Sequence, residues 1–238
     1  MTEPGRIEGA VVVTGGTGGL GSAVIADLLD AGAEVVTTWL VDRERERFEA
    51  SELGGHEGLA LVEANLLEDG AETAVAAARE RGPLRGLVNV AGGFASGPRL
   101  HEADSAELDR LLALNLKTAA NSARAALPAM IDAGGGSIVC VGARAALEPF
   151  SGGAAYAISK SAVLALVRSL DAEYRDDGVR ANAILPSVID TPANREASPG
   201  ADFSKWVTPA QIARVIRFLC SEDSAPVSGA AIPVYGRA

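Results

Sequence analysis

A tyrosine and a lysine in the second half of the chain have the types and spacing of a proton-transfer pair. Tyr156 and Lys160 are four residues apart in a helical pattern, so both would lie on one face of a helix. A free phenol has a pKa of about 10, and a neighbouring ammonium favours the phenolate, which brings the tyrosine closer to proton transfer at neutral pH. Such pairs are also common on helix surfaces, so the assignment depends on the rest of the chain.

A glycine-rich segment, residues 14–21, lies between the first expected strand and the first expected helix. Gly15, Gly19 and Gly21 have the spacing G-x-x-x-G-x-G. Gly15 would allow a tight turn, Gly19 would let the backbone approach a pyrophosphate, and Gly21 would let helix and sheet pack closely. Backbone amides over residues 17–20 would then face phosphate at a helix N-terminus. The alternative interpretation is a plain glycine-rich turn.

Small residues also follow the fourth expected strand. Asn89, Ala91 and Gly92 belong to the run Asn-Val-Ala-Gly-Gly, where a nicotinamide riboside could lie against the backbone. The glycine loop, this strip and the Tyr156–Lys160 pair together predict a dinucleotide-dependent active site.

Short β-branched runs alternate with longer helical patterns, which indicates βαβ units around a parallel sheet buried on both faces. The expected strands cover residues 10–13, 34–38, 58–63, 84–90, 137–141, 180–185 and 230–234. The expected helices cover residues 20–29, 42–53, 71–81, 106–132, 154–175 and 209–220, with Pro128 as a kink. Right-handed crossovers predict one α/β domain over residues 1–238, a doubly wound Rossmann fold with a seven-stranded parallel sheet and helices on both faces.

The composition excludes several classes of partner. The 238 residues carry 21 Lys and Arg against 31 Asp and Glu, a net charge of −10 that repels nucleic acid and anionic membranes. The two cysteines and two histidines are isolated, so neither a disulfide framework nor a metal site is expected. Neither a signal peptide nor a membrane-spanning run is evident, so we expect a cytoplasmic protein with a small-molecule substrate.

The motifs resemble the short-chain dehydrogenase/reductase family over nearly the whole chain. The matching features are the loop 14–21, the strip 89–92, Asn115, the Tyr156–Lys160 pair and the segment 186–191. The resemblance implies that Tyr156 donates a proton, that Lys160 holds the nicotinamide ribose and lowers the tyrosine pKa, and that Asn115 anchors a relay water. The cofactor-binding residues that it implies are Gly15, Thr17, Gly18, Gly19, Leu20, Trp39, Arg43, Asn65, Leu66, Asn89, Ala91, Gly92, Tyr156, Lys160, Pro186, Val188 and Thr191.

One residue of the family pattern is missing. The family serine that bonds a substrate carbonyl falls thirteen positions before Tyr156, where this chain has Ala143. Loss of one donor to a developing oxyanion costs about 2.7–4 kcal/mol in other enzymes. The protein has therefore either lost activity or acts on a substrate that does not need the serine.

Three segments resemble the quinonoid dihydropteridine reductase branch of the family. They are residues 91–94, 142–147 and 185–206, with Phe94 where that branch has a tryptophan beside the pterin. The resemblance implies reduction of a quinonoid dihydropterin, or of a related C=N or quinone-like compound, with hydride added to a conjugated ring and a proton to nitrogen. The expected substrate residues are Phe94, Ala143, Arg144 and Trp206, with a substrate loop at about residues 187–207. Phe94 as a hydrophobic wall for another substrate is the alternative.

The end of the second strand normally selects the cofactor, because an acidic residue there binds the ribose hydroxyls of NAD. This chain has Trp39 at that position, followed by Arg43 and Arg45, and arginine suits a 2′-phosphate. The sequence therefore favours NADPH over NADH. Asp42 and a solvated helix face with alternating charges are the features that oppose this interpretation.

Small residues on the helices 106–132 and 154–175, where family members pair, predict a homodimer or homotetramer. Packing of the same residues on the sheet is the alternative. Two other functions stay open: a carbonyl reductase that works without the serine, and an NAD(P)-binding protein without turnover.

Overall fold

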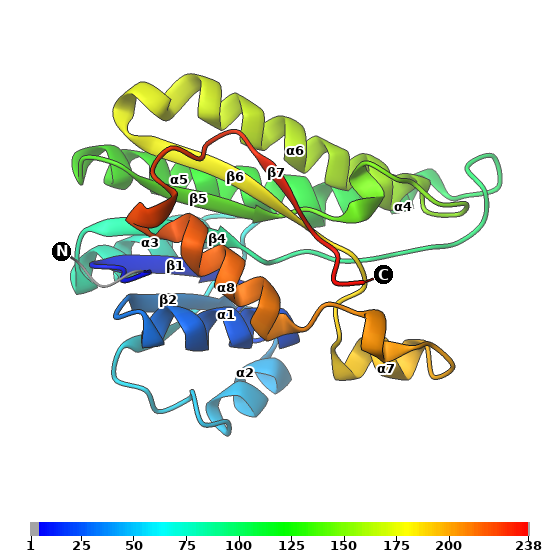
Figure 1. The fold of residues 1–238 in the computed structure, drawn as a ribbon, viewed down its shortest axis with the longest axis horizontal. Coiled ribbons are helices and arrows are strands. Elements are labelled where there is room, and N and C mark those ends of the chain that lie inside the picture. The colour runs from blue at the N-terminus through cyan, green and yellow to red at the C-terminus, as the bar shows by residue number, and fades with distance from the viewer. Residues whose placement is uncertain (1–4, 238) are drawn as a thin grey trace.

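One sheet of seven parallel strands crosses the molecule in the order β3-β2-β1-β4-β5-β6-β7 (Figure 1). The computed structural model describes residues 5–237. The strands are β1 (Ala10–Thr14), β2 (Glu34–Trp39), β3 (Leu59–Glu63), β4 (Leu84–Asn89), β5 (Gly136–Val141), β6 (Val179–Pro186) and β7 (Ala231–Val234). Each overlaps one of the seven expected runs, so the predicted doubly wound sheet is confirmed.

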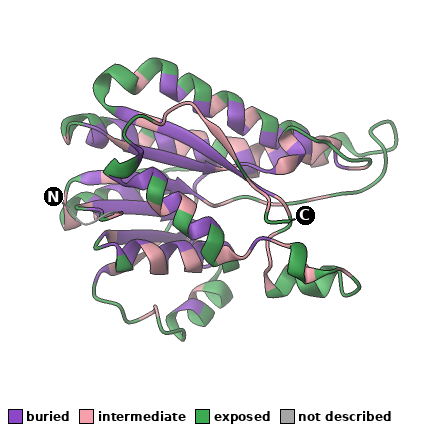
Figure 2. Ribbon diagram, in the orientation of Figure 1, coloured by how far each residue is buried: buried purple, intermediate pink, exposed green. Residues whose placement is uncertain are grey.

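Helices cover both faces of the sheet. On one face, α1 (Gly19–Asp30) and α8 (Pro209–Cys220) share a core with the strands, and Phe48 of α2 (Asp42–Glu49) joins that core. On the other face, α3 (Gly70–Arg81), α5 (Thr118–Asp132) and α6 (Ala154–Tyr174) form a second core. The strands between these layers are largely buried (Figure 2), which explains their continuous apolar runs.

The expected helix 106–132 is divided into three parts. It consists of α4 (Ser105–Leu111), a π-helix (Leu112–Lys117) and α5. A kink was expected at Pro128, and Pro128 does lie within α5. The π-helical departure from α-geometry, however, is centred near Asn115. Single-turn π-bulges are frequent at functional sites, because they turn a side chain away from its regular helical direction.

Two other elements differ from the expected ones. The helix expected over residues 42–53 ends at Glu49. The segment 187–207, expected as a loop, contains α7 (Pro192–Ala197), whose N-cap Thr191 accepts a hydrogen bond from the amide of Asn194. A helix of six residues is too short to give a clear periodic signal.

The strand order reverses direction between β1 and β4, so the loops that follow these strands diverge on opposite faces of the sheet. In open α/β sheets ligands bind in the crevice that this reversal creates at the carboxyl ends of the strands. The glycine loop after β1, the strip after β4 and the segment after β6 all leave this edge. No helix within residues 5–237 is long and apolar enough to cross a membrane.

Candidate active site

The glycine loop after β1 is fixed by close backbone packing. Gly15 has φ +67°, the left-handed conformation that glycine adopts without strain. A Cβ on Gly16 would lie 1.9 Å from Oγ1 of Thr37, and one on Gly21 would lie 2.4 Å from the Gly15 carbonyl oxygen. The Gly15 amide donates to Oγ1 of Thr38 at 3.2 Å, which ties the loop to β2.

The other side of the loop remains open for a ligand. Helix α1 begins at Gly19, and its N-cap Gly18 makes no side-chain cap, so the amides of the first turn keep donors for an anion. No acidic residue lies in that turn. A Cβ on Gly19 would lie 3.2 Å from Cγ2 of Thr191, so backbone and threonine face each other across a narrow gap. The free amides of this turn can donate to a dinucleotide pyrophosphate.

The strip after β4 packs against the loop with little space for side chains. The Ala91 amide donates to Oγ1 of Thr14 at 3.2 Å, and a Cβ on Gly15 would lie 2.8 Å from Cα of Ala91. Asn89 is buried beneath the strip, where its Nδ2 donates to Sγ of Cys140 at 3.5 Å. The strip can therefore present its backbone to a flat ligand.

Asn115 connects the strip to the helix that carries the tyrosine. Its Oδ1 accepts from the Gly93 amide at 2.8 Å, and its Nδ2 donates to the Gly93 carbonyl at 3.1 Å and to Oγ of Ser159 at 2.9 Å. Ser159 is fully buried and donates to the Tyr156 carbonyl at 2.8 Å. The sequence analysis missed Ser159, although its position directly before Lys160 on the same helix could have suggested it.

Lys160 is an almost completely buried cation, 6% exposed. Its Nζ donates to the Val141 carbonyl at 2.8 Å, and a Cβ on Gly92 would lie 3.4 Å from Nζ. Burial lowers the pKa of the Lys160 ammonium to about 8, with a smaller opposing effect from Cys140. One carbonyl cannot satisfy three N–H donors, so the ammonium retains donors for a ligand such as ribose hydroxyls.

The family resemblance implied that Lys160 lowers the pKa of Tyr156, but in the structure the pKa of Tyr156 shifts in the opposite direction. Burial raises the pKa of the Tyr156 phenol to about 12. The Lys160 ammonium donates a hydrogen bond to the Val141 carbonyl, and this bond offsets part of the free energy needed to bury the charge. The raised pKa keeps the Tyr156 phenol protonated over a wider pH range, and the protonated form is the one that can donate a proton.

Two phenylalanines form an aromatic wall beside the phenol. The ring of Phe94 meets the ring of Tyr156 edge to face, with centroids 5.0 Å apart and planes at 74°. Phe150 lies 6.3 Å from Phe94 in a stacked arrangement, with planes at 25°. Phe94 is 63% exposed, so most of its ring surface is available to a ligand. Ala143, two residues past β5, is buried and offers only a methyl group.

Two expected substrate residues, Arg144 and Trp206, have no described contact with Tyr156 or Phe94. Arg144 binds Glu148 and lies over the ring of Tyr235, with its guanidinium carbon 4.9 Å from the ring centroid. Trp206 packs on Phe203 with centroids 4.8 Å apart. In the same region Pro186 ends β6 in the core, and Val188 is exposed.

The end of β2 brings aromatic and basic side chains together. Trp39 ends the strand, and the guanidinium carbon of Arg45 lies 4.8 Å from the centroid of its ring. Arg45 also bonds Asp42 and Glu49, whereas Arg43 is exposed on the first turn of α2.

Helix α2 contacts the glycine loop through two residues that the sequence analysis did not assign to the site. Arg47 donates to the Thr17 carbonyl at 3.1 Å, and the Thr17 hydroxyl donates to Glu44 at 3.3 Å. The expected adenine contacts lie after β3, where Asn65 caps the turn by accepting from the Leu67 amide and Leu66 is buried.

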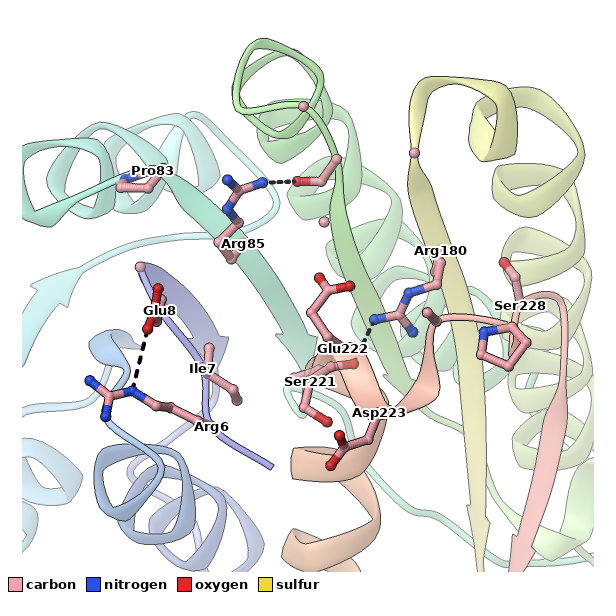
Figure 3. A pocket seen from close by; sticks show the side chains of 18 of the residues that line it. Arg6, Ile7, Glu8, Pro83, Arg85, Arg180, Ser221, Glu222, Asp223 and Ser228 are labelled. Carbon is pink, nitrogen blue, oxygen red and sulfur yellow. Dashed lines mark hydrogen bonds and ion pairs between the residues drawn. The ribbon is translucent and has the colours of Figure 1, made fainter. Parts of the chain in front are cut away.

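A cavity of about 870 Å³ lies at the opposite, amino-terminal edge of the sheet (Figure 3). Arg85 and Arg180, which line this cavity, already donate hydrogen bonds to oxygen atoms of the protein itself. Arg85 donates to the Ala133 carbonyl at 2.7 Å, and Arg180 donates to the Ser221 carbonyl at 3.1 Å and to Oγ of Ser224 at 2.7 Å. Among residues 5–237, no group of three or more His, Cys, Asp or Glu could hold a metal ion.

Residues 9–202 match the family model described as short chain dehydrogenase. The chain is 33% identical over 247 residues to 2-(S)-hydroxypropyl-CoM dehydrogenase 3 of Xanthobacter autotrophicus, covering 95% of this chain and 94% of that protein. It is 32% identical over 246 residues to D-threitol dehydrogenase of Mycolicibacterium smegmatis, covering 97% and 93%.

A solved structure of a gluconate 5-dehydrogenase from Burkholderia cenocepacia, in complex with NADP and tartrate, superposes with a TM-score of 0.85. The two chains are 25% identical, and the match covers 98% of this chain and 96% of that one. All three of these proteins are named for dehydrogenation of hydroxy compounds, and none is named for dihydropterin reduction.

Proposed function

Because this chain belongs to the short chain dehydrogenase family and is therefore an NAD(P)-dependent oxidoreductase, we propose that it reduces a planar, conjugated small molecule. A quinonoid dihydropterin, or a related C=N or quinone-like compound, is the substrate class that we favour. The observation that carries this proposal is the aromatic wall beside Tyr156, combined with a methyl group at Ala143 where the family has a serine hydroxyl.

The cofactor would lie across the carboxyl edge of β1 and β4. The pyrophosphate would bind the amides of residues 17–20, opposite Thr191, and the nicotinamide riboside would lie on the strip of Ala91 and Gly92. Lys160 would bind the ribose hydroxyls. Arg43, exposed near Trp39, would bind a 2′-phosphate, so we propose NADPH as the preferred form. The bound cofactor supplies a hydride.

The chain itself supplies the proton. The phenol of Tyr156 is protonated at neutral pH, and burial extends this form to higher pH by raising its pKa to about 12. Proton donation to a substrate nitrogen leaves a phenolate, which the nearby Lys160 would stabilise once cofactor binding draws its ammonium from Val141. Asn115, held by Gly93 and Ser159, would anchor the water through which the phenol regains its proton.

The substrate class follows from what the pocket offers. A ketone reductase benefits from two donors to the developing oxyanion, and this pocket has one, because Ala143 cannot donate. A quinonoid C=N system that accepts a hydride and is protonated on nitrogen develops less charge on oxygen. Such a ring could stack on Phe94, a contact worth about 0.5–1.5 kcal/mol beyond burial.

A steady-state assay with NADPH and enzymatically generated quinonoid dihydropterin tests the proposal. We expect NADPH consumption by the wild type and a loss of about 100- to 10,000-fold in kcat for Tyr156→Phe, because general acid catalysis contributes 10²–10⁴-fold. The variant should bind NADPH as the wild type does. Absence of consumption above background with pterins and quinones would overturn the proposed substrate class.

A second candidate is a dehydrogenase of small hydroxy compounds, and the names of the relatives at 32–33% identity favour it. The substitution Ala143→Ser separates the two candidates. Under our proposal it raises ketone reduction by orders of magnitude from an almost inert wild type. If the wild type already oxidises a secondary alcohol efficiently, the second candidate is correct.

We also propose that two copies pair through α5 and α6. Ala119, Ala123 and Ala126 pack inward on the sheet, whereas Ala120, Ser161, Ala162 and Ala165 stay accessible. An apolar groove of about 520 Å³ lies beside Ala120, Leu127 and Ile131. Small residues allow two helices to approach closely, and the mass measured in solution by light scattering tests this pairing.

A further inference from the structure

The segment 187–207, here named the substrate segment, leaves the sheet after β6 and returns to it before α8. Its two ends are joined by a bridge between Ile189 and Val207, with the Asp190 amide donating to the Val207 carbonyl at 2.8 Å. Between these ends its side chains mainly bind one another, as Arg195 does with Asp190 and Phe203 with Trp206. A segment whose side chains mainly contact one another needs contacts with the rest of the protein to keep one position relative to the active site.

The last described residues of the chain supply such contacts. Residues 235–237, here named the C-terminal strap, follow β7 and pass beside the base of the substrate segment (Figure 1). The Tyr235 carbonyl accepts from Oγ of Ser187 at 2.7 Å, and the Arg237 amide donates to the Lys205 carbonyl at 3.0 Å. The strap therefore binds both the beginning and the end of the substrate segment.

Gly236 makes this contact sterically possible. Its φ of +67° is strained for any other residue. A Cβ there would lie 3.0 Å from the Lys205 carbonyl oxygen and 3.1 Å from the Val207 amide nitrogen. A side chain at this position would push the strap away from the backbone of residues 205–207.

Tyr235 extends the contact to a third part of the site. Its ring lies under the guanidinium of Arg144, which directly follows Ala143 at the exit of β5. Thr191 of the substrate segment faces Gly19 of the glycine loop, so a shift of the segment would also alter the cofactor cradle. The strap thus joins Arg144, just past the end of β5, to both ends of the substrate segment.

We propose that the C-terminal strap, through the backbone of Gly236 and Arg237, positions the substrate segment over the active site. Gly236 is then a positioning residue that touches neither substrate nor cofactor. The kinetic part of this inference rests on the proposed function, whereas the structural part can be tested without any turnover.

Tryptic cleavage provides the test without turnover, because Arg195 and Lys205 of the substrate segment are exposed. We expect Gly236→Ala to raise the rate of cleavage after these two residues at least tenfold, with a melting temperature close to that of a control variant that carries similar backbone strain. The matched control is Gly134→Ala, which also has a positive φ (+81°) but would meet nothing within 4 Å. It imposes similar backbone strain without disturbing a contact.

Kinetics distinguish a positioning role from a merely structural one. With an accepted substrate, Gly236→Ala should raise KM about tenfold and leave kcat within twofold, because the segment must close before the same chemistry occurs. Ser187→Ala should change KM in the same direction by a smaller factor, and Arg237→Ala should match the wild type, since Arg237 acts through its backbone amide.

Unchanged cleavage in Gly236→Ala, or equal acceleration in Gly134→Ala, would overturn the role of the strap. A fall in kcat with constant KM would overturn the positioning role as well. If no tested substrate is consumed but cleavage accelerates only in Gly236→Ala, the proposed function is wrong, whereas the inference that the C-terminal strap positions the substrate segment is supported.

Discussion

Replacement of the buried lysine should stabilise the protein at neutral pH and abolish its activity. Burial lowers the pKa of Lys160 from 10.5 to about 8. Each unit of pKa shift corresponds to about 1.4 kcal/mol, so the buried ammonium costs about 3 kcal/mol at pH 7. Lys160→Met removes this cost but leaves the Val141 carbonyl without its partner, which costs about 1–3 kcal/mol. We expect a net gain in unfolding free energy of about 0–2 kcal/mol.

The pH dependence of this gain is the sharper test. Between pH 8 and 10.5 the unfolded chain holds a proton on Lys160 that the folded chain has lost, so the stability of the wild type rises with pH in this window. The cost of the ammonium falls from about 3 kcal/mol at pH 7 to about 1 kcal/mol at pH 10. Lys160→Met has no proton to lose at this position. The difference in unfolding free energy between the variant and the wild type should therefore fall by about 2 kcal/mol from pH 7 to pH 10 and change sign.

Urea unfolding at pH 7 and pH 10, at one fixed protein concentration, measures both values. Lys117→Met, at an exposed lysine, controls for the loss of a positive charge. A difference between Lys160→Met and the wild type that stayed constant from pH 7 to pH 10 would refute the reasoning, because Lys160 would then carry no desolvated charge.

Two further substitutions test the network around the tyrosine and the choice of cofactor. Ser159→Ala removes one of the two acceptors of Asn115 Nδ2 and leaves only the Gly93 carbonyl, so it should lower the unfolding free energy by about 1–3 kcal/mol and reduce kcat more than it changes KM. Denaturation and steady-state kinetics measure these effects, and an unchanged kcat would contradict the link between Ser159 and Asn115. Trp39→Asp places a carboxylate where Arg45 now stacks, so titrations of both cofactors should show the preference for NADPH over NADH falling by at least about tenfold, about 1.4 kcal/mol. An unchanged ratio of the two Kd values would mean that the end of β2 does not select the cofactor.

Local sequence determined the elements of the fold and part of the site. The β-branched runs predicted all seven strands, because a parallel strand buried on both faces must be apolar throughout. The spacing of Gly15, Gly19 and Gly21 predicted a glycine loop between strand and helix, and the four-residue spacing of Tyr156 and Lys160 predicted that both lie on one helix. These features depend on neighbours within a few residues.

Tertiary structure decided the contacts between distant segments. Phe94 meets Tyr156, Ser159 meets Asn115, and Gly236 meets Lys205, although each pair is far apart in the sequence. The order of the strands brings their loops to one edge, and no periodicity encodes which side chains then touch.

The hydrogen-bond partner of the Lys160 ammonium was also decided by the tertiary structure. Spacing indicates that Lys160 shares a face with Tyr156, but only the packed site shows the ammonium bonded to the Val141 carbonyl and the phenol pKa raised by burial. Desolvation is a property of everything that surrounds a group, so its effect on a pKa cannot be obtained from residue types alone. The sequence therefore determined which groups could transfer a proton, and the tertiary structure decided how far burial shifts their pKa values and which atom the ammonium contacts.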